Sequence, residues 1–170
     1  MEFAADTWRL SFQRRVGEGV DRNRGSLPFH LITTDDLTVR ILVPLPAGEG
    51  LWIAWNLKPG LRVTGRTRDN ASVRIVPLTN SMTDWSLYSA DAVLGRGDAG
   101  TTDADSFQPI DTEAQLEIDH LVFEVLDEGG ATLNRVAIVI GTPSLYAHLT
   151  GLAAPVPSTP ADAYGGWRLP

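Results

Sequence analysis

The stretch GEGLWIAWNLKPGL, residues 48–61, decides the fold expected of this chain. From Leu51 to Leu57, wholly apolar positions alternate with mixed ones, which is the period-2 pattern of a half-buried β-strand. The tripeptide KPG at 58–60 is a turn signal, because proline presets φ early in a turn and glycine accepts positive φ. The stretch therefore predicts two strands joined by a tight turn.

Short alternating runs of the same kind follow one another along the first half of the chain, separated by polar turn residues. They read TWRLSF (7–12), PFHLIT (28–33), LTVRILV (37–43), GLWIAWNL (50–57), LRVTGR (61–66) and ASVRIVPL (71–78). Further on, the segment 120–141 predicts a hairpin closed by DEGG at 127–130, with a bulge near Asn134 where the alternation changes phase. A helix over 111–126 competes with the first arm. We favour a strand for 120–126, because Val and Phe prefer strands, and leave 111–119 open.

Two other segments predict short helices. TPSLYAHLTG offers Thr142 as N-cap, Pro143 at the first helical position and Gly151 at the end. TDWSLYSADAVLG, residues 83–95, begins with threonine, ends with glycine and places three apolar or aromatic side chains on one helical face.

About eight to ten short strands with one or two short helices predict an all-β fold, either a β-sandwich or a jelly roll. Strand counting alone does not separate these from a closed barrel. We expect residues 1–150 to form a single β-sandwich domain. The Pro- and Gly-rich residues 151–170 are expected to be a tail ordered by contacts with the protein's own surface or with a neighbouring copy. Its predicted anchors are Tyr164, Trp167 and Arg168.

Composition restricts the function. The 170 residues contain no cysteine, which excludes disulfides, thiolate catalysis and cysteine-bound zinc. The net charge of −7 argues against nucleic acid as the main partner. Residues 1–80 hold eleven Arg and Lys against eight Asp and Glu, whereas residues 81–170 hold three against thirteen. The two halves are therefore expected to lie against each other in one fold or, alternatively, to meet between neighbouring copies.

The N-terminus has no signal-peptide pattern and no segment approaches the length of a membrane span, so we expect cytoplasmic synthesis or a place in a virion. Lysine occurs once among fourteen basic residues, which is typical of a GC-rich coding sequence and suggests a bacterial or phage source.

The mixed face of the 50–57 strand carries Trp52. If the neighbouring predicted strands lie beside it, Trp52 is surrounded by Arg40, Arg62 and Arg74. These arginines can stack on the indole at a solvated surface, which we favour, or form with it a face for an anionic partner. A sugar stacked on Trp52 is a third use.

Other candidate residues carry weaker signals. The loop aspartates Asp98, Asp103 and Asp105 are weak candidates for a hard cation, but their spacing does not match an EF-hand, and we favour a solvated loop. The three histidines have no metal-ligand spacing. His30 and His120 fall inside predicted strands, where a structural role is favoured. The Asp119-His120 pair lacks a nucleophile motif such as Gly-x-Ser-x-Gly.

Three glutamates, Glu113, Glu117 and Glu124, could pair with an aspartate in a glycosidase-like site, which depends on geometry that the sequence does not show. No nucleophile–base or metal motif rises above background. We therefore expect no enzymatic activity, no zinc and no cofactor.

These observations predict a non-enzymatic structural or interaction subunit of a larger assembly, of phage or virion type and homo-oligomeric. Its partner is expected to be itself or another subunit, not nucleic acid or a membrane. The first alternative is a lectin-like carbohydrate- or anion-binding module that uses the Trp/Arg face. The second is a small carboxylate-based hydrolase.

Overall fold

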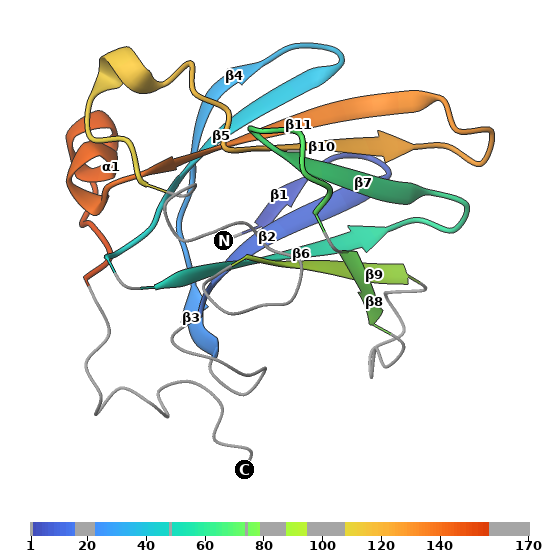
Figure 1. Cartoon of the computed structure of the whole chain (residues 1–170), viewed down its shortest axis with the longest axis horizontal. Coiled ribbons are helices and arrows are strands. Elements are labelled where there is room, and N and C mark those ends of the chain that lie inside the picture. The colour runs from blue at the N-terminus through green and yellow to red at the C-terminus, as the bar shows by residue number, and fades with distance from the viewer. Residues whose placement is uncertain are drawn as a thin grey trace.

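The computed structural model describes residues 2–15, 23–47, 49–73, 75–78, 88–94 and 108–156, and the predicted all-β fold is confirmed (Figure 1). The described strands form two sheets. Sheet A has the order β1-β2-β6-β9-β8, with β3 paired to β2. Its strands are β1 (Glu2–Ala4), β2 (Trp8–Arg15), β3 (Asn23–Ser26), β6 (Gly50–Leu57), β8 (Ile75–Leu78) and β9 (Tyr88–Leu94).

Sheet B has the order β4-β5-β11-β10-β7. Its strands are β4 (His30–Thr34), β5 (Thr38–Pro44), β7 (Arg62–Thr67), β10 (Leu121–Leu126) and β11 (Thr132–Gly141). β5 and β11 run parallel, with Thr38 opposite Arg135 and Pro44 opposite Gly141, whereas the other pairs in the sheet are antiparallel. Two strands from opposite ends of the chain therefore form the centre of this sheet.

β6 has the two faces that its sequence predicts. Leu51, Ile53, Trp55 and Leu57 are at most 4% exposed, while Trp52 and the other alternate positions are half-buried. The side-chain period of a strand is two, so this alternation directs one face of β6 toward the core and the other outward.

The inner faces of the two sheets share one core, in a sandwich-like arrangement. Trp55 of sheet A packs on Phe123 of sheet B with ring centroids 5.3 Å apart, and Trp8 packs on Trp55 at 5.5 Å. The Trp8 indole N–H also donates to the Asn134 side chain of sheet B, at 2.9 Å. Aromatic packing and this hydrogen bond connect the sheets at the same place.

A second, smaller core lies on the outer face of sheet B. Leu42 of β5 and Val139 of β11 are fully buried there, beneath Ile110 and Leu145. The cover consists of the segment 108–119, which contains the 3-10 helix η2 (Glu113–Gln115), and of α1 (Pro143–Thr150). Figure 1 shows η2 and α1 at the same end of sheet B. Sheet B is thus covered on both faces at this end.

Several local predictions are confirmed. The 120–141 segment is a hairpin, and its register shifts so that Leu133 has no partner between Thr132 and Asn134. α1 begins after Thr142, has proline at its first position and ends at Gly151, which takes φ +68°.

None of the helices in the described part of the chain has both the length and the hydropathy of a membrane span.

The helix predicted over 83–95 is wrong where the structure describes it. Residues 88–94 form β9, which pairs with both β6 and β8 in sheet A. Backbone hydrogen bonds to two neighbouring strands outweigh a weak helical pattern of side chains. Of the strand predicted over 71–78, residues 75–78 form β8, residue 72 makes an isolated bridge to Arg66, and residues 74 and 83–87 lie outside the described ranges.

Candidate functional site

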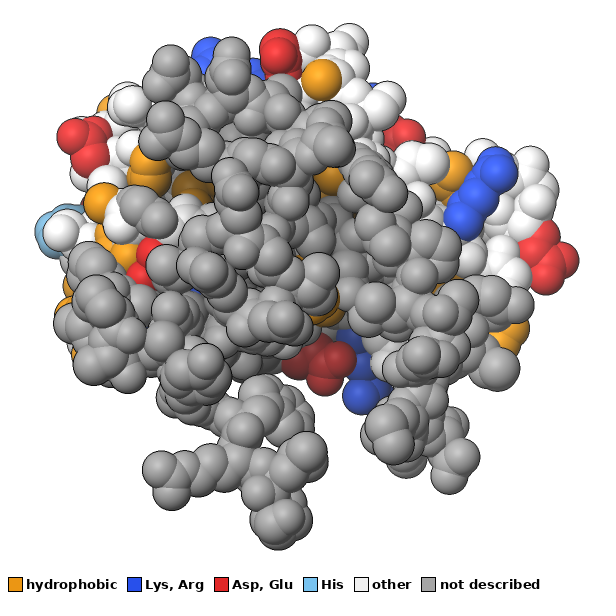
Figure 2. All heavy atoms as spheres, turned by 60° about the horizontal axis from the view of Figure 1, so that its bottom comes forward, with side chains coloured by type: hydrophobic (Ala, Val, Ile, Leu, Met, Phe, Trp, Pro, Cys, Tyr) orange, Lys and Arg blue, Asp and Glu red, His pale blue; other side chains and the backbone are white. Residues whose placement is uncertain are grey.

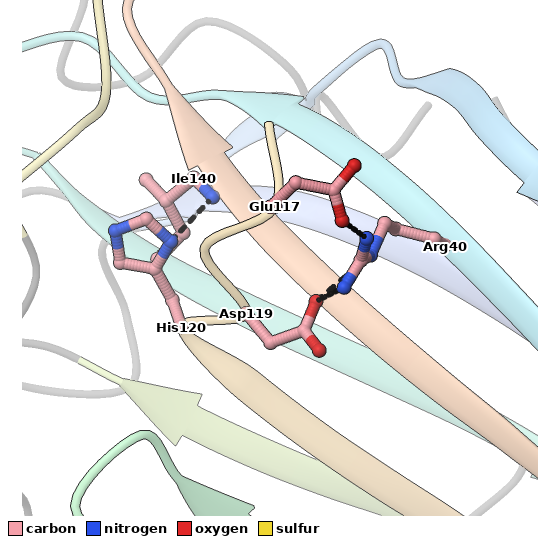
Figure 3. Close-up of polar contacts among 5 residues, drawn as sticks. All are labelled: Arg40, Glu117, Asp119, His120 and Ile140. Atoms are coloured by element: carbon pink, nitrogen blue, oxygen red, sulfur yellow. Dashed lines mark hydrogen bonds and ion pairs between the residues drawn. The ribbon is translucent and has the colours of Figure 1, made fainter. Parts of the chain in front are cut away.

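A cluster of charged side chains on the outer face of sheet B centres on Arg40 of β5. Its guanidinium binds Glu117 at 2.6 Å and Asp119 at 2.8 Å, so that one cation lies between two carboxylates (Figure 3). We call Arg40, Glu117 and Asp119 the Arg40 clasp. It fastens the end of the 108–119 segment to β5.

The electrostatics of the clasp favour the charged guanidinium. Partial burial by itself lowers the pKa of Arg40, but the hydrogen bond to Glu117 and the negative charge of Asp119 raise it, and the net pKa lies above its ordinary value. Arg40 is therefore a permanent cation whose donors are directed at carboxylates. A cation held in this way is suited to fixing structure rather than to moving a proton.

His120 follows the clasp directly and is only 4% exposed. Its Nδ1 accepts a hydrogen bond from the backbone N–H of Ile140 at 3.0 Å, and its Nε2 lies 3.1 Å from the carbonyl oxygen of Gln108. The N–H of Ile140 requires an unprotonated Nδ1, which places the ring proton on Nε2, where Gln108 accepts it. The structural role predicted for His120 agrees with this geometry.

The three glutamates considered for hydrolysis each contact a different basic side chain. Glu117 contacts Arg40, Glu124 lies 3.8 Å from Arg66, and Glu113 lies 3.2 Å from His148. Within the described residues, no group of three or more His, Asp or Glu side chains is arranged to hold a metal ion. These three carboxylates thus contact basic side chains of other elements.

The predicted face around Trp52 is not assembled, because the strand adjacency on which it depended is wrong. Trp52 lies on β6 in sheet A, where its register partners are Gln13 and Val93. Arg40 and Arg62 lie on β5 and β7, which belong to sheet B. Consecutive strands along the chain alternate here between sheets, so sequence neighbours do not become neighbours in space.

Trp52 still occupies a distinctive position on the outer face of sheet A. The side chain is half-buried, and among the described residues its indole N–H has no hydrogen-bond partner. Ser11 and Ala54, the next cross-strand pair, are small. A flat aromatic side chain beside small neighbours is the feature that makes this face a candidate for ligand contact.

Several predicted site residues lie outside the described residues, at least in their side chains. They are Arg74 of the arginine face, Asp98, Asp103 and Asp105 of the acidic loop, and the tail anchors Tyr164, Trp167 and Arg168.

Sequence reasoning missed the buried ion pair between Arg14 of β2 and Glu49. The Arg14 Nε lies 2.7 Å from Glu49, and the two side chains are only 14% and 3% exposed. Arg14 also donates to the backbone carbonyl of Val156. A signal was present, because Arg14 continues the inward-facing positions of Trp8, Leu10 and Phe12, where a charge needs a partner.

Ion pairs between the basic and the acidic half of the sequence occur within one chain. Arg40 binds Glu117 and Asp119, and Arg66 approaches Glu124. Figure 2 likewise shows described acidic and basic side chains interspersed along the rim of the molecule. This favours the intramolecular explanation of the charge asymmetry over attraction between copies.

No family model matches the chain, and searches of curated proteins and of solved structures likewise returned no match.

Proposed function

We propose that this protein is a non-enzymatic interaction subunit that uses its C-terminal segment to associate with a copy of itself or with another subunit of an assembly. The observation that carries the proposal is the start of that segment. After α1 the chain is attached to the body through Arg14, which binds the carbonyl of Val156. Yet the apolar side chains of Leu152 and Val156 are 56% and 71% exposed.

This arrangement supports association for a physical reason. A segment fixed to the body by its backbone, with its apolar side chains directed to solvent, leaves hydrophobic area that a partner can bury. The fourteen residues that follow Val156 include Tyr164 and Trp167. Aromatic side chains of this kind contribute most of the binding energy in many interfaces.

Three clusters of described polar side chains also favour a non-catalytic role. The Arg40 clasp, His120 and the Arg14–Glu49 pair each use their polar atoms to connect separate elements of the fold. A catalytic nucleophile or base needs a polar atom that is available to a substrate.

Light scattering coupled to gel filtration tests the proposal. We compare the full chain with a variant that lacks residues 161–170 and with Trp167→Ala, and expect the full chain to be an oligomer that both changes dissociate. Leu37→Ser is the matched control, because Leu37 is 62% exposed on the body and its loss should leave the mass unchanged. A full chain that is monomeric at every concentration, and unaltered by the deletion, would reject the proposal.

The second candidate function is a lectin-like module, favoured by the position of Trp52 beside small residues on sheet A. Sugars commonly stack on exposed aromatic rings, and such a site needs no partner subunit. A glycan array probed with the wild type and with Trp52→Ala separates the two functions. Binding that is lost in the variant would favour the lectin reading, whereas a dependence of mass on the tail favours the interaction subunit.

A further inference from the structure

The segment 108–119, which we call the cover segment, is held by polar contacts at both of its ends, and between them Glu113 lies 3.2 Å from the exposed side chain of His148 in α1. Its backbone forms one bridge to β11, in which the N–H of Ile110 donates to Ile140 at 2.9 Å and its carbonyl accepts from Thr142 at 2.8 Å. The Arg40 clasp holds its far end. His120 binds both Gln108, at the start of the segment, and Ile140, on the sheet.

Among these contacts, the hydrogen bonds of His120 are the ones that require a neutral imidazole. The N–H of Ile140 is directed at Nδ1 from 3.0 Å, so a proton added at Nδ1 would bring two donors face to face. The ring is almost wholly buried, and a positive charge there is costly without an acceptor. Protonation therefore breaks the bond to Ile140 and favours movement of the ring toward water.

We propose that His120 is an acid-sensitive latch whose protonation releases the cover segment from the outer face of sheet B. Release uncovers the small core beneath the segment, where Leu42 and Val139 are otherwise fully buried. The released state keeps sheet A and the main core between the sheets, because neither includes the cover segment.

The charged surroundings of the ring are consistent with this direction. Burial lowers the pKa of His120, and the positive charge of Arg68, at the end of β7, lowers it further. The hydrogen bonds to backbone carbonyls and the negative charge of Asp119 act in the opposite sense without outweighing them. Asp119 is itself paired with the Arg40 guanidinium at 2.8 Å. Towards β11 the ring accepts a hydrogen bond from the backbone N–H of Ile140 (Figure 3).

The sign of the pH effect follows from this pKa. A histidine whose pKa is lower in the closed state than in the open state binds more protons when the segment is open. The closed state is therefore fully favoured above the pKa of a free histidine, and loses stability as the pH falls below about 6.5. Because a single proton is involved, the equilibrium constant for opening can change by at most about tenfold per pH unit.

Amide hydrogen exchange followed by NMR tests the latch. Protection factors of Ile110, Ile140 and Thr142, corrected for intrinsic exchange, should fall by up to about tenfold per pH unit between about pH 6.5 and pH 5. Amides of β6 in sheet A should keep their protection over the same range, which distinguishes local release from global unfolding. The imidazole signals of His120 should titrate together with the loss of protection.

Three variants make the test specific. His120→Gln retains a donor and an acceptor but cannot titrate, and should abolish the pH dependence. His30→Gln is the matched control, which removes a histidine of β4 and should preserve the pH dependence. His148→Gln should preserve it as well, although it removes the contact of His148 with Glu113 of the cover segment. Constant protection in the wild type would overturn the proposal. An equal fall in protection in His120→Gln would also overturn it. If that variant does not fold, a titration of the His120 imidazole at a different pH from the loss of amide protection would overturn the proposal instead.

Discussion

At the scale of single residues, burial decides how much a charge contributes to this structure. Arg14 and Glu49 form a bidentate pair with side-chain exposures of 14% and 3%. Arg9 and Glu2 join the same two residue types on the same sheet, but at 3.7 Å and with exposures of 50% and 47%. Water and salt screen the exposed pair, whereas the buried one has lost its hydration and depends on its partner.

This contrast predicts that Glu49→Gln is far more destabilising than Glu2→Gln. Removing one partner of a buried ion pair typically costs about 3–5 kcal/mol, and we expect a loss near the lower end because Arg14 keeps its hydrogen bond to the carbonyl of Val156. Loss of an exposed pair costs about 0–1 kcal/mol. Urea unfolding followed by tryptophan fluorescence measures both values. Equal, small losses in the two variants would show that Arg14 finds another partner or water in place of Glu49.

At the scale of elements, caps and turns determine the residues at which helices and strands begin and end, which side-chain packing alone does not define. Thr142 has an extended backbone and its side chain accepts a hydrogen bond from the N–H of Leu145 at 3.2 Å, which begins α1. Thr112 holds the same position before η2 but makes no capping bond of this kind. The two threonines therefore form a natural pair for measuring what a cap contributes.

We expect Thr142→Ala to destabilise the protein by about 1 kcal/mol, within the range of about 0.5–2 kcal/mol measured for N-cap losses. Thr112→Ala should change the free energy of unfolding by less than about 0.5 kcal/mol, as surface substitutions generally do. Thermal and urea unfolding of the two variants, compared with the wild type, supply the measurement. A cost at Thr112 that equals or exceeds the cost at Thr142 would contradict this account of α1.

The elements differ in how far the sequence could predict them, for physical reasons. The two faces of β6, the hairpin around Gly130 and the caps of α1 depend on residues close together in the chain, and these local patterns were sufficient. β9 was expected to be helical because the sequence of one segment shows its own periodicity but does not show that β6 and β8 pair with it in the fold. Tertiary pairing overrides local preference in such cases.

The candidate site was harder to predict, because it depends on strand order. Arg40 was named as a candidate, but with Trp52 and Arg62 as neighbours instead of Glu117 and Asp119. Arg40 and Glu117 are 77 residues apart in the chain, and only the parallel pairing of β5 with β11 brings the cover segment over β5. No local pattern encodes a contact of that separation.

At the scale of the whole molecule, stability depends on how firmly the two sheets are joined. The described contacts include the packing of the tilted rings of Trp8, Trp55 and Phe123, and one hydrogen bond from the Trp8 indole to Asn134 of β11. Trp55, by comparison, has an indole N–H without a partner among the described residues. Asn134 stands beside the bulge at Leu133, so the irregularity in β11 and the contact between the sheets occur together.

This arrangement predicts coupling between Trp8 and Asn134 in a double-mutant cycle. Asn134→Ala leaves the buried Trp8 N–H unsatisfied and should cost about 1–3 kcal/mol. Trp8→Phe removes the donor, so adding Asn134→Ala to it should cost clearly less than in the wild-type background. The difference between the two costs is the coupling energy, expected at about 0.5–1.5 kcal/mol for a neutral hydrogen bond. Trp55→Phe serves as the control background, because it also removes an indole N–H but none that Asn134 accepts. Additive effects with Trp8→Phe, or equal coupling with Trp55→Phe, would show that the bond does not hold the sheets together.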